Sequence, residues 1–228
     1  MGYGDDVTGD EIAFFSALDL ERDDMAAVRK AVEGRDWKTA KEAWAQHLES
    51  RESPAWTWSH RDKETIMAFL EEHGEGLERY VERADRVLRR EFSFQGIKRT
   101  LDKDILWWSE DYEFQWINVL HRHGYWLDLG RAYWTTGDER YAEDWVHMLK
   151  DWIQSNPVQI HVGANPRDRK GQPWRKLETG GRTKTWIEAM NFFMDAPAFD
   201  AEAKYLFSRS IRDHAKRLVA SRSEEHTS

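Results

Sequence analysis

Aromatic and charged residues recur at steps of four in the stretch PWRKLETGGRTKTW, which spans residues 173–186. The recurring residues are Trp174, Glu178, Arg182 and Trp186. A helix has about 3.6 residues per turn, so this spacing puts them near one side of a helix. Indole rings offer flat faces on which a sugar ring can pack, and a guanidinium can form paired hydrogen bonds with a carboxylate or a sulfate. The stretch therefore has the side chains of a binding surface for an anionic sugar.

The same residues also have an internal explanation. Glu178 and Arg182 can form an ion pair between positions i and i+4, worth about 0.2–0.5 kcal/mol on an exposed helix, and we favour this structural pair over a substrate contact by Arg182. The two indoles drift by about 40° per four residues, so either Trp174 or Trp186 is expected in the core. The glycine pair at 180–181 costs about 1 kcal/mol per residue relative to alanine, which a helix tolerates where a neighbouring backbone or a ligand comes close.

Positive charge gathers around this stretch although the whole chain is acidic. The net charge is −8, which argues against a general nucleic-acid binder because phosphate backbones require an electropositive face. Between Arg167 and Lys184, however, seven basic and two acidic residues give a local charge of +5. This patch favours an anionic ligand, and Arg169 within it is a further binding candidate.

More candidate residues lie in the middle of the chain. Trp107 and Trp108 are adjacent in a predicted irregular loop, which must bury both indoles or display one. His121, Arg122 and His123 follow on a predicted helix, where a general base is possible although a hydrogen-bonded structural histidine is the more common case. No carboxylate stands at a helical step that would complete a metal site with them, so we predict neither a metal nor a cofactor.

Composition limits the class of protein. The chain has 228 residues, 40% of them hydrophobic, so it can bury a sizeable core as one large domain or two small ones. It has no cysteine, which excludes disulfides and thiol catalysis, and no apolar run of about 18 residues that could span a membrane. Its first residues lack the features of a secretory signal. The thirteen tryptophans are expected to be mostly core residues.

Helix boundaries recur along the chain, whereas strand-like alternation and Asn-Gly turns are missing. Aspartates stand at predicted helix starts, and glycine or Asn-Pro at predicted ends. The predicted helices cover residues 24–33, 36–48, 63–73, 76–91, 112–136, 139–155, the stretch from 173 to about 194, and 201–220, with an irregular aromatic loop over 92–111. We therefore predict an all-α chain of sequential helical hairpins.

The last seven residues, RSEEHTS, match the translation of a common sequencing-adaptor sequence. We expect residues 222–228 to be an artefact that follows a natural segment ending near Ser221.

One interpretation of the helical pattern is a repeat protein. Gly130, Tyr133, Gly137 and Ala142 fall at the separations of a tetratricopeptide unit. A solenoid needs at least three units at a period of about 34 residues, and only a faint second echo lies near residues 34–48. A non-catalytic helical-hairpin scaffold that binds a protein or a glycan is therefore the alternative function.

A second interpretation accounts for four motifs in one order. They are W-x-x-x-L-H-R at Trp116–Arg122, A-Y-x-x-T-G-D-E-x-Y-A at Ala132–Ala142, D-W-I-x-x-N-P at Asp151–Pro157, and W-x-x-L-E-x-x-x-R-x-x-x-W at Trp174–Trp186. This ordered set resembles the N-terminal domain of the heparinase II/III superfamily of polysaccharide lyases. The resemblance extends from about Phe14 to Ser221, so residues 1–221 are predicted to be that domain.

The resemblance implies an incomplete α/α toroid of helical hairpins with a long groove, followed by a C-terminal β-sandwich domain. It implies β-elimination of an acidic, uronate-containing polysaccharide, such as heparan sulfate or alginate, in the periplasm or outside the cell. Elimination needs a group that neutralises the uronate carboxylate, a Tyr or His base and an acid. We expect these catalytic residues beyond Ser221, so the present chain is expected to be inactive alone. The candidate substrate-binding residues are Trp107, Trp108, His121, Arg122, Arg169, Trp174 and Arg182.

Overall fold

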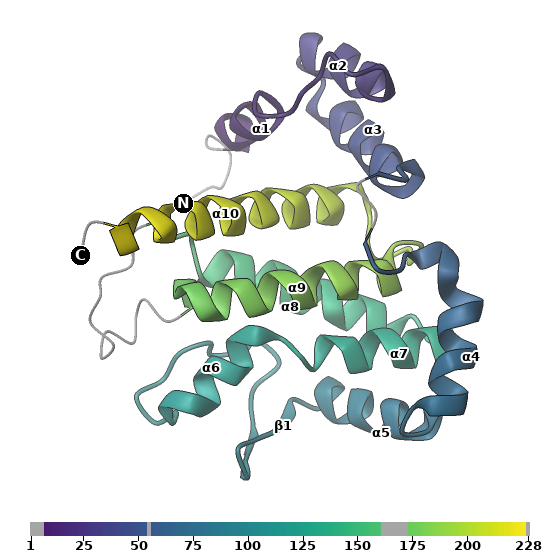
Figure 1. Ribbon diagram of the computed structural model, residues 1–228, viewed down its shortest axis with the longest axis vertical. Coiled ribbons are helices and arrows are strands. Elements are labelled where there is room, and N and C mark those ends of the chain that lie inside the picture. Colours follow the sequence, from purple (N-terminus) through teal and green to yellow (C-terminus); the bar gives the residue numbers. More distant parts are fainter. Residues whose placement is uncertain (1–6, 54–55, 161–172, 227–228) are drawn as a thin grey trace. The chain divides into compact units, whose positions relative to one another are not determined.

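The structure is a computed structural model that describes residues 7–53, 56–160 and 173–226. Within these ranges the chain is helical apart from one small sheet (Figure 1). The α-helices are α1 (Val7–Phe15), α2 (Ala26–Glu33), α3 (Trp37–Ser50), α4 (Lys63–His73), α5 (Leu77–Leu88), α6 (Phe114–Arg122), α7 (Trp126–Thr136), α8 (Arg140–Ser155), α9 (Lys176–Phe193) and α10 (Ala201–His226). Two 3-10 helices, η1 (Asp23–Met25) and η2 (His60–Asp62), and two strands, β1 (Glu91–Phe94) and β2 (Ile97–Thr100), complete the elements.

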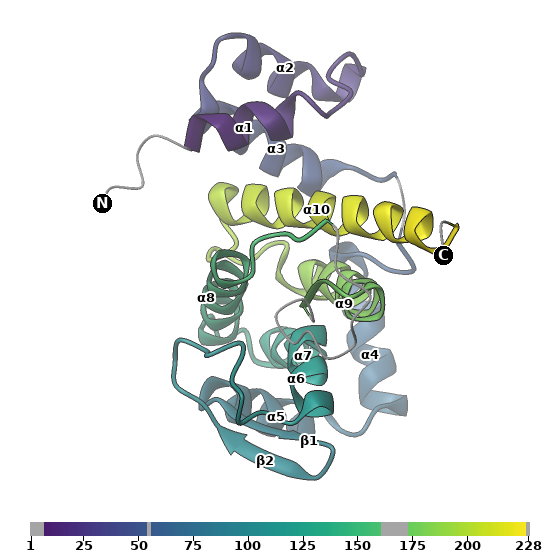
Figure 2. The same ribbon diagram turned by 90° about the vertical axis from the view of Figure 1, so that its left-hand side faces the viewer.

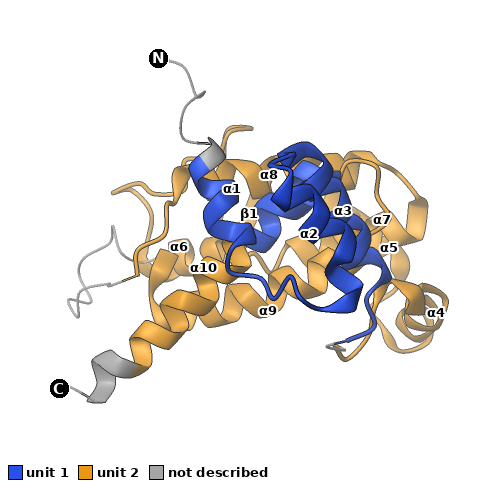
Figure 3. Ribbon diagram, turned by 90° about the horizontal axis from the view of Figure 1, so that it is seen from above, with its two compact units in different colours: residues 1–54, 200–209 blue, residues 55–199, 210–228 orange. Residues whose placement is uncertain are grey.

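The chain forms two compact units, coloured separately in Figure 3. The first contains residues 1–54 and 200–209, and its α2 and α3 pack as the predicted hairpin. The predicted cap is present, since the Asp36 carboxylate accepts a hydrogen bond from the backbone N–H of Thr39 at 3.1 Å. Phe15 stacks on Tyr205 in its core.

The second unit contains residues 55–199 and 210–228. Helix α7 packs against α5, α8 and α9, and α6 packs against α9. One helix pair comes very close, because a Cβ at Gly130 of α7 would lie 2.5 Å from the Phe192 ring of α9. Five fully buried indoles fill much of this core: Trp116, Trp126, Trp145, Trp152 and Trp186.

The predicted single helix over residues 112–136 is wrong, because the structure divides it into α6 and α7. His123 takes a left-handed conformation with φ 57° directly after α6, and Gly124 follows. Tertiary contacts hold this break: the His123 ring stacks on Trp126 at 4.2 Å, and its Nδ1 accepts a hydrogen bond from Trp186 Nε1 at 2.8 Å. The contact with Trp186, 63 residues further along the chain, has no local signal in the sequence.

The predicted irregular loop over 92–111 is also partly wrong. Strands β1 and β2 pair antiparallel from Glu91 opposite Thr100 to Phe94 opposite Ile97. Figure 2 shows this hairpin beside α5. Its two-residue turn has positive φ at both Gln95 and Gly96, as a type I′ turn requires. Glutamine replaces the usual asparagine, which explains why the hairpin was not predicted.

Candidate substrate-binding site

Residues 173–186 lie in and just before α9, and all four of the residues that recur at steps of four are buried. Trp174, Arg182 and Trp186 are in the core, and Arg182 and Trp186 are fully buried. The prediction that one of the two tryptophans is a core residue holds for both. Trp174 and Arg182 therefore present no surface to a polymer in this conformation, and their assignment as substrate contacts stays an untested prediction.

The ion pair predicted between Glu178 and Arg182 is not formed among the described residues. Glu178 Oε1 instead accepts a hydrogen bond from Arg122 Nη2 at 3.0 Å, and Glu178 Oε2 lies 3.7 Å from Arg175 Nε. The first partner stands on α6, far away in sequence, so helical spacing alone could not identify it.

Arg182 is held by aromatic faces and neutral acceptors. Its Nε donates to His214 Nε2 at 2.7 Å, and its Nη1 donates to the His121 carbonyl at 3.2 Å. The guanidinium lies 4.2 Å from the Trp152 ring centre, a cation–π distance. Burial lowers the pKa of Arg182 to about 9, partly opposed by the charge of Glu178. The group therefore stays protonated at neutral pH and connects α6, α9 and α10.

Three buried histidines surround this arginine and are neutral. Burial and the nearby Arg182 charge lower the pKa of His121 to about 3 and those of His123 and His214 well below 6.5. His121 Nδ1 accepts a hydrogen bond from Trp152 Nε1 at 3.1 Å. His214 Nδ1 donates to the Ser210 carbonyl, because its Nε2 accepts from Arg182. His121 thus has a structural role in the core, and its assignment as a substrate contact stays an untested prediction.

The tryptophan pair displays only one of its members. Trp107 is buried, and its Nε1 donates to Asp151 at 2.7 Å. Its ring contacts those of His121 and His123 at the junction of α6 and α7, so it packs in the core, and its assignment as a substrate contact stays an untested prediction. Trp108 is half-buried and stays a candidate for sugar stacking. Trp108 directly follows the buried Trp107 in the chain, and Arg122 stands between the buried His121 and His123.

Arg122 is the cationic candidate that the structure leaves at the surface. Its side chain is 37% exposed, and that of Arg175 is 35% exposed, whereas that of the Glu178 between them is 1% exposed. Arg175 also lies over the Phe114 ring. Arg175 was not among the sequence candidates, although its position three residues before Glu178 was a usable signal.

Close protein packing does not explain the two glycines of α9. Among the described residues, a Cβ at Gly180 would meet nothing within 4 Å, and one at Gly181 would first meet Arg122 Cγ at 3.8 Å, an ordinary contact. Gly181 therefore leaves its backbone uncovered beside the Arg122 side chain.

Three further predictions concern the basic loop, a metal site and a membrane span. Arg169 and most of the basic loop lie outside the described residues. Within the described ranges, no cluster of three or more His, Cys, Asp or Glu residues could hold a metal ion. None of the described helices is long and apolar enough to cross a membrane.

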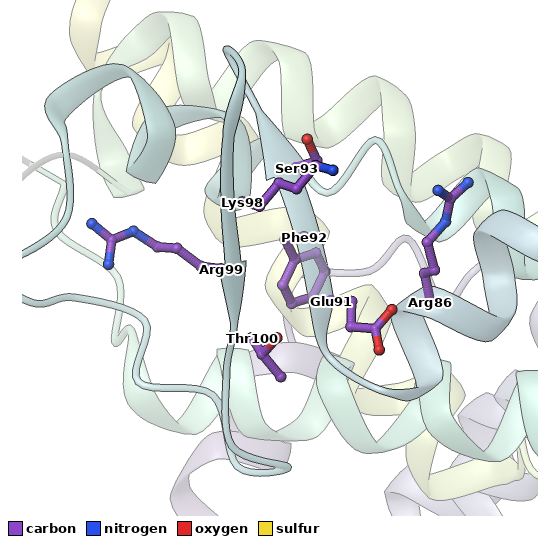
Figure 4. A pocket seen from close by; sticks show the side chains of 7 residues that line it. All are labelled: Arg86, Glu91, Phe92, Ser93, Lys98, Arg99 and Thr100. Atoms are coloured by element: carbon purple, nitrogen blue, oxygen red, sulfur yellow. The ribbon is translucent and has the colours of Figure 1, made fainter.

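A shallow hollow of about 300 Å³ lies against the hairpin (Figure 4). Figure 4 shows that Arg99 points away from Arg86 across the strands. Arg99 is bound to Glu113 at 3.0 Å and to the Asp111 carbonyl at 2.6 Å, and Glu91 is bound to Arg89. The lining residues are Arg86, Glu91, Phe92, Ser93, Lys98, Arg99 and Thr100. They include no tyrosine or histidine that could remove a proton from a sugar.

The described helices and the aromatic core around Arg182 define a helical domain of the α/α-toroid class. The family model described as Heparinase II/III N-terminus matches residues 14–226, so the chain belongs to this family. The tetratricopeptide interpretation is therefore replaced by the predicted family.

Curated relatives and solved structures agree with this membership. A heparin-sulfate lyase of Pedobacter heparinus is 32% identical over 126 residues, which cover 54% of this chain and 18% of that protein. A heparin-sulfate lyase of Bacteroides stercoris is 29% identical over 125 residues, which cover 50% of this chain and 18% of that protein. The crystal structure of heparan sulfate lyase HepC from Pedobacter heparinus has a TM-score of 0.69 and 25% identity, with 93% of this chain and 32% of that chain covered. A heparinase III structure with methylated lysines has a TM-score of 0.73 and 21% identity, and the alignment covers 92% of this chain and 33% of that chain.

These likenesses confirm the predicted all-α, incomplete α/α-toroid fold class. The chain spans about a fifth of the length of the curated relatives that it matches.

Proposed function

We propose that the full-length protein containing this chain is a lyase that cleaves a heparan-sulfate-like, uronate-containing polysaccharide by β-elimination. The observation that carries the proposal is the family match over residues 14–226, together with relatives that are heparin-sulfate lyases. These names favour a heparan-sulfate-like substrate over an alginate-like one.

The tyrosines and histidines of the aromatic core suit a supporting role better than the chemical steps. A base for elimination must be unprotonated and must reach a sugar. Burial raises the pKa of Tyr125 well above 10 and, together with hydrogen bonds to carboxylates, those of Tyr133 and Tyr141 to about 12. The neutral His121, His123 and His214 are enclosed in the core. We therefore expect the 228-residue chain to be inactive alone, with its elimination groups supplied by the rest of the protein.

The partial coverage of the relatives supports a further domain in the full-length protein, and the bounds of the natural segment are proposed from the sequence alone. A C-terminal β-sandwich domain is the proposed partner of this helical domain, with residues 1–221 as the natural segment and 222–228 as an artefact. Sequencing the gene past Ser221 tests this. An Asn, a Tyr and a His followed by strand-rich sequence would support it, whereas a continuing helical repeat would favour the scaffold alternative. Periplasmic or secreted location is likewise proposed, and cell fractionation checks it.

Activity is tested by incubating the full-length protein with heparan sulfate, alginate and a neutral glucan. Elimination creates a carbon–carbon double bond at each new uronate end, and this chromophore absorbs ultraviolet light. We expect absorbance to rise with heparan sulfate and not with the glucan, while the 228-residue chain gives no rise. Absence of new unsaturated ends with every uronate polymer contradicts the proposed function.

A further inference from the structure

We propose that Arg122 and Arg175, oriented by the buried carboxylate of Glu178, form a binding site for one anionic group, a carboxylate or a sulfate, of the sugar polymer. This inference rests on the proposed function and names residues of this chain that would contact its substrate.

The geometry of Glu178 is the first support. Its carboxylate is almost fully enclosed, and a charge in such a place requires compensation. Arg122 provides it from the last turn of α6, through the 3.0 Å hydrogen bond, and Arg175 from the residue just before α9. Glu178 also lies in the first turn of α9, where a negative charge is favoured. One fixed carboxylate therefore orients two arginines from two different elements.

The balance of charge and donors is the second support. Two guanidinium groups face one carboxylate, so the trio keeps one unit of positive charge at a partly exposed position. Each guanidinium carries five N–H donors, and Glu178 occupies few of them. Arg175 Nη1 is enclosed and has no hydrogen-bond partner among the described residues, so the donors open to a ligand are the other N–H groups of the two partly exposed guanidiniums. A monoanionic group with several acceptor oxygens matches this surplus.

Access for a polymer is the third support. Gly181 stands three residues after Glu178, on the same side of α9, and next to Arg122. A Cβ at Gly180 would meet none of the residues that the structure describes within 4 Å. Because neither glycine has a Cβ, a sugar ring can approach the helix backbone while its charged substituent meets the arginines. The absence of a packing reason for the glycines is consistent with this approach.

The site is tested by steady-state kinetics of two variants of the full-length protein, Arg122→Gln and Arg175→Gln. Each variant is assayed on heparan sulfate and on chemically desulfated heparan sulfate. Each variant loses contacts of a guanidinium with an anion, and we expect KM to rise roughly tenfold while kcat stays within about twofold. Arg131→Gln is the matched control, because Arg131 is 28% exposed and also paired with a carboxylate, that of Asp128. We expect its KM to stay within about twofold of the wild-type value.

The two substrates distinguish the bound group. If the arginines bind a sulfate, the variants lose affinity only for the sulfated polymer; if they bind a carboxylate, they lose it for both. Melting curves identify variants that do not fold, and Arg122→Lys then replaces Arg122→Gln, since it keeps the charge and loses the planar fork.

An unchanged KM in both folded arginine variants, or an equal rise in the Arg131→Gln control, overturns the site. If the wild-type protein cleaves no uronate polymer, the proposed function fails, and the site is judged by calorimetric binding of a heparan sulfate oligosaccharide at low and high salt. Binding that weakens with salt in the wild type, and is roughly tenfold weaker in Arg122→Gln, supports the anion site without the lyase activity. Equal binding by both proteins rejects it.

Discussion

At the level of single residues, burial gives two arginines of one sequence region different roles. Arg182 lies on indole faces in the core, and its acceptors are an imidazole and a backbone carbonyl. Arg175, seven residues earlier, is at the surface beside Glu178. The residue types alone predicted a structural or binding role for a carboxylate and a guanidinium in residues 173–186. The sequence could not predict that Glu178 binds Arg122, because only the folded chain brings α6 to α9.

Replacing Arg182 tests its structural role. Arg182→Ala empties a space between indoles and leaves the His121 carbonyl and His214 Nε2 without their donor. We expect the free energy of unfolding to fall by about 3–5 kcal/mol. Arg182→Met keeps most of the volume and should cost clearly less. Urea denaturation of both variants measures this, and an alanine variant within about 0.5 kcal/mol of wild type would show that the buried guanidinium is not structural.

The buried histidines predict a pH dependence of stability. Their pKa values are lowered in the folded protein from an ordinary value of 6.5, so the unfolded chain binds more protons as the pH falls below that value. Their contribution is constant above about pH 6.5 and is lost below it, by about 2 kcal/mol per histidine at about pH 5. Denaturation at several pH values measures the slope.

The control for this pH dependence is His214→Gln, which can still accept the hydrogen bond from Arg182 but cannot take up a proton. Its stability should fall less steeply than that of the wild type between about pH 6.5 and pH 5. Identical slopes would mean that His214 is not buried in its neutral form.

At the level of helices and strands, boundary residues predicted most of the helices, and tertiary contacts account for the errors. The Asp36 cap and the end of α7 at Gly137 follow local rules that a sequence displays. The break at His123 depends on Trp126 and Trp186, and Trp186 lies far along the chain. The hairpin depends on a Gln-Gly turn with an uncommon first residue.

Three glycine-to-alanine substitutions separate the reasons for these glycines. Gly137 has φ 70°, so alanine there should destabilise by about 1–2 kcal/mol through backbone strain. Gly130→Ala should also destabilise, because its Cβ would meet the Phe192 ring at 2.5 Å. Gly180→Ala has open space in a helix and should stabilise by up to about 1 kcal/mol. Thermal unfolding ranks the three, and a destabilised Gly180→Ala variant would contradict this account of α9.

At the level of the whole molecule, the described residues form a helical domain of the family described as Heparinase II/III N-terminus. Family membership rests on residues 14–226, and the curated relatives extend far beyond the matched part. The fold class and the family could be predicted from four ordered motifs, because those motifs contain core residues such as Trp116, Trp152 and Trp186. The surface that would meet a polymer could be predicted only in part, since exposure depends on how the helices pack.

The most direct test of the proposed lyase activity is the mass of the products that the full-length protein releases from a heparan sulfate oligosaccharide of defined mass. Elimination breaks the glycosidic bond without adding water, so the masses of the two products should sum to the substrate mass, with the unsaturated uronate on one of them. Products whose masses sum to the substrate plus one water would reveal hydrolysis and contradict the account, as would an oligosaccharide that stays intact.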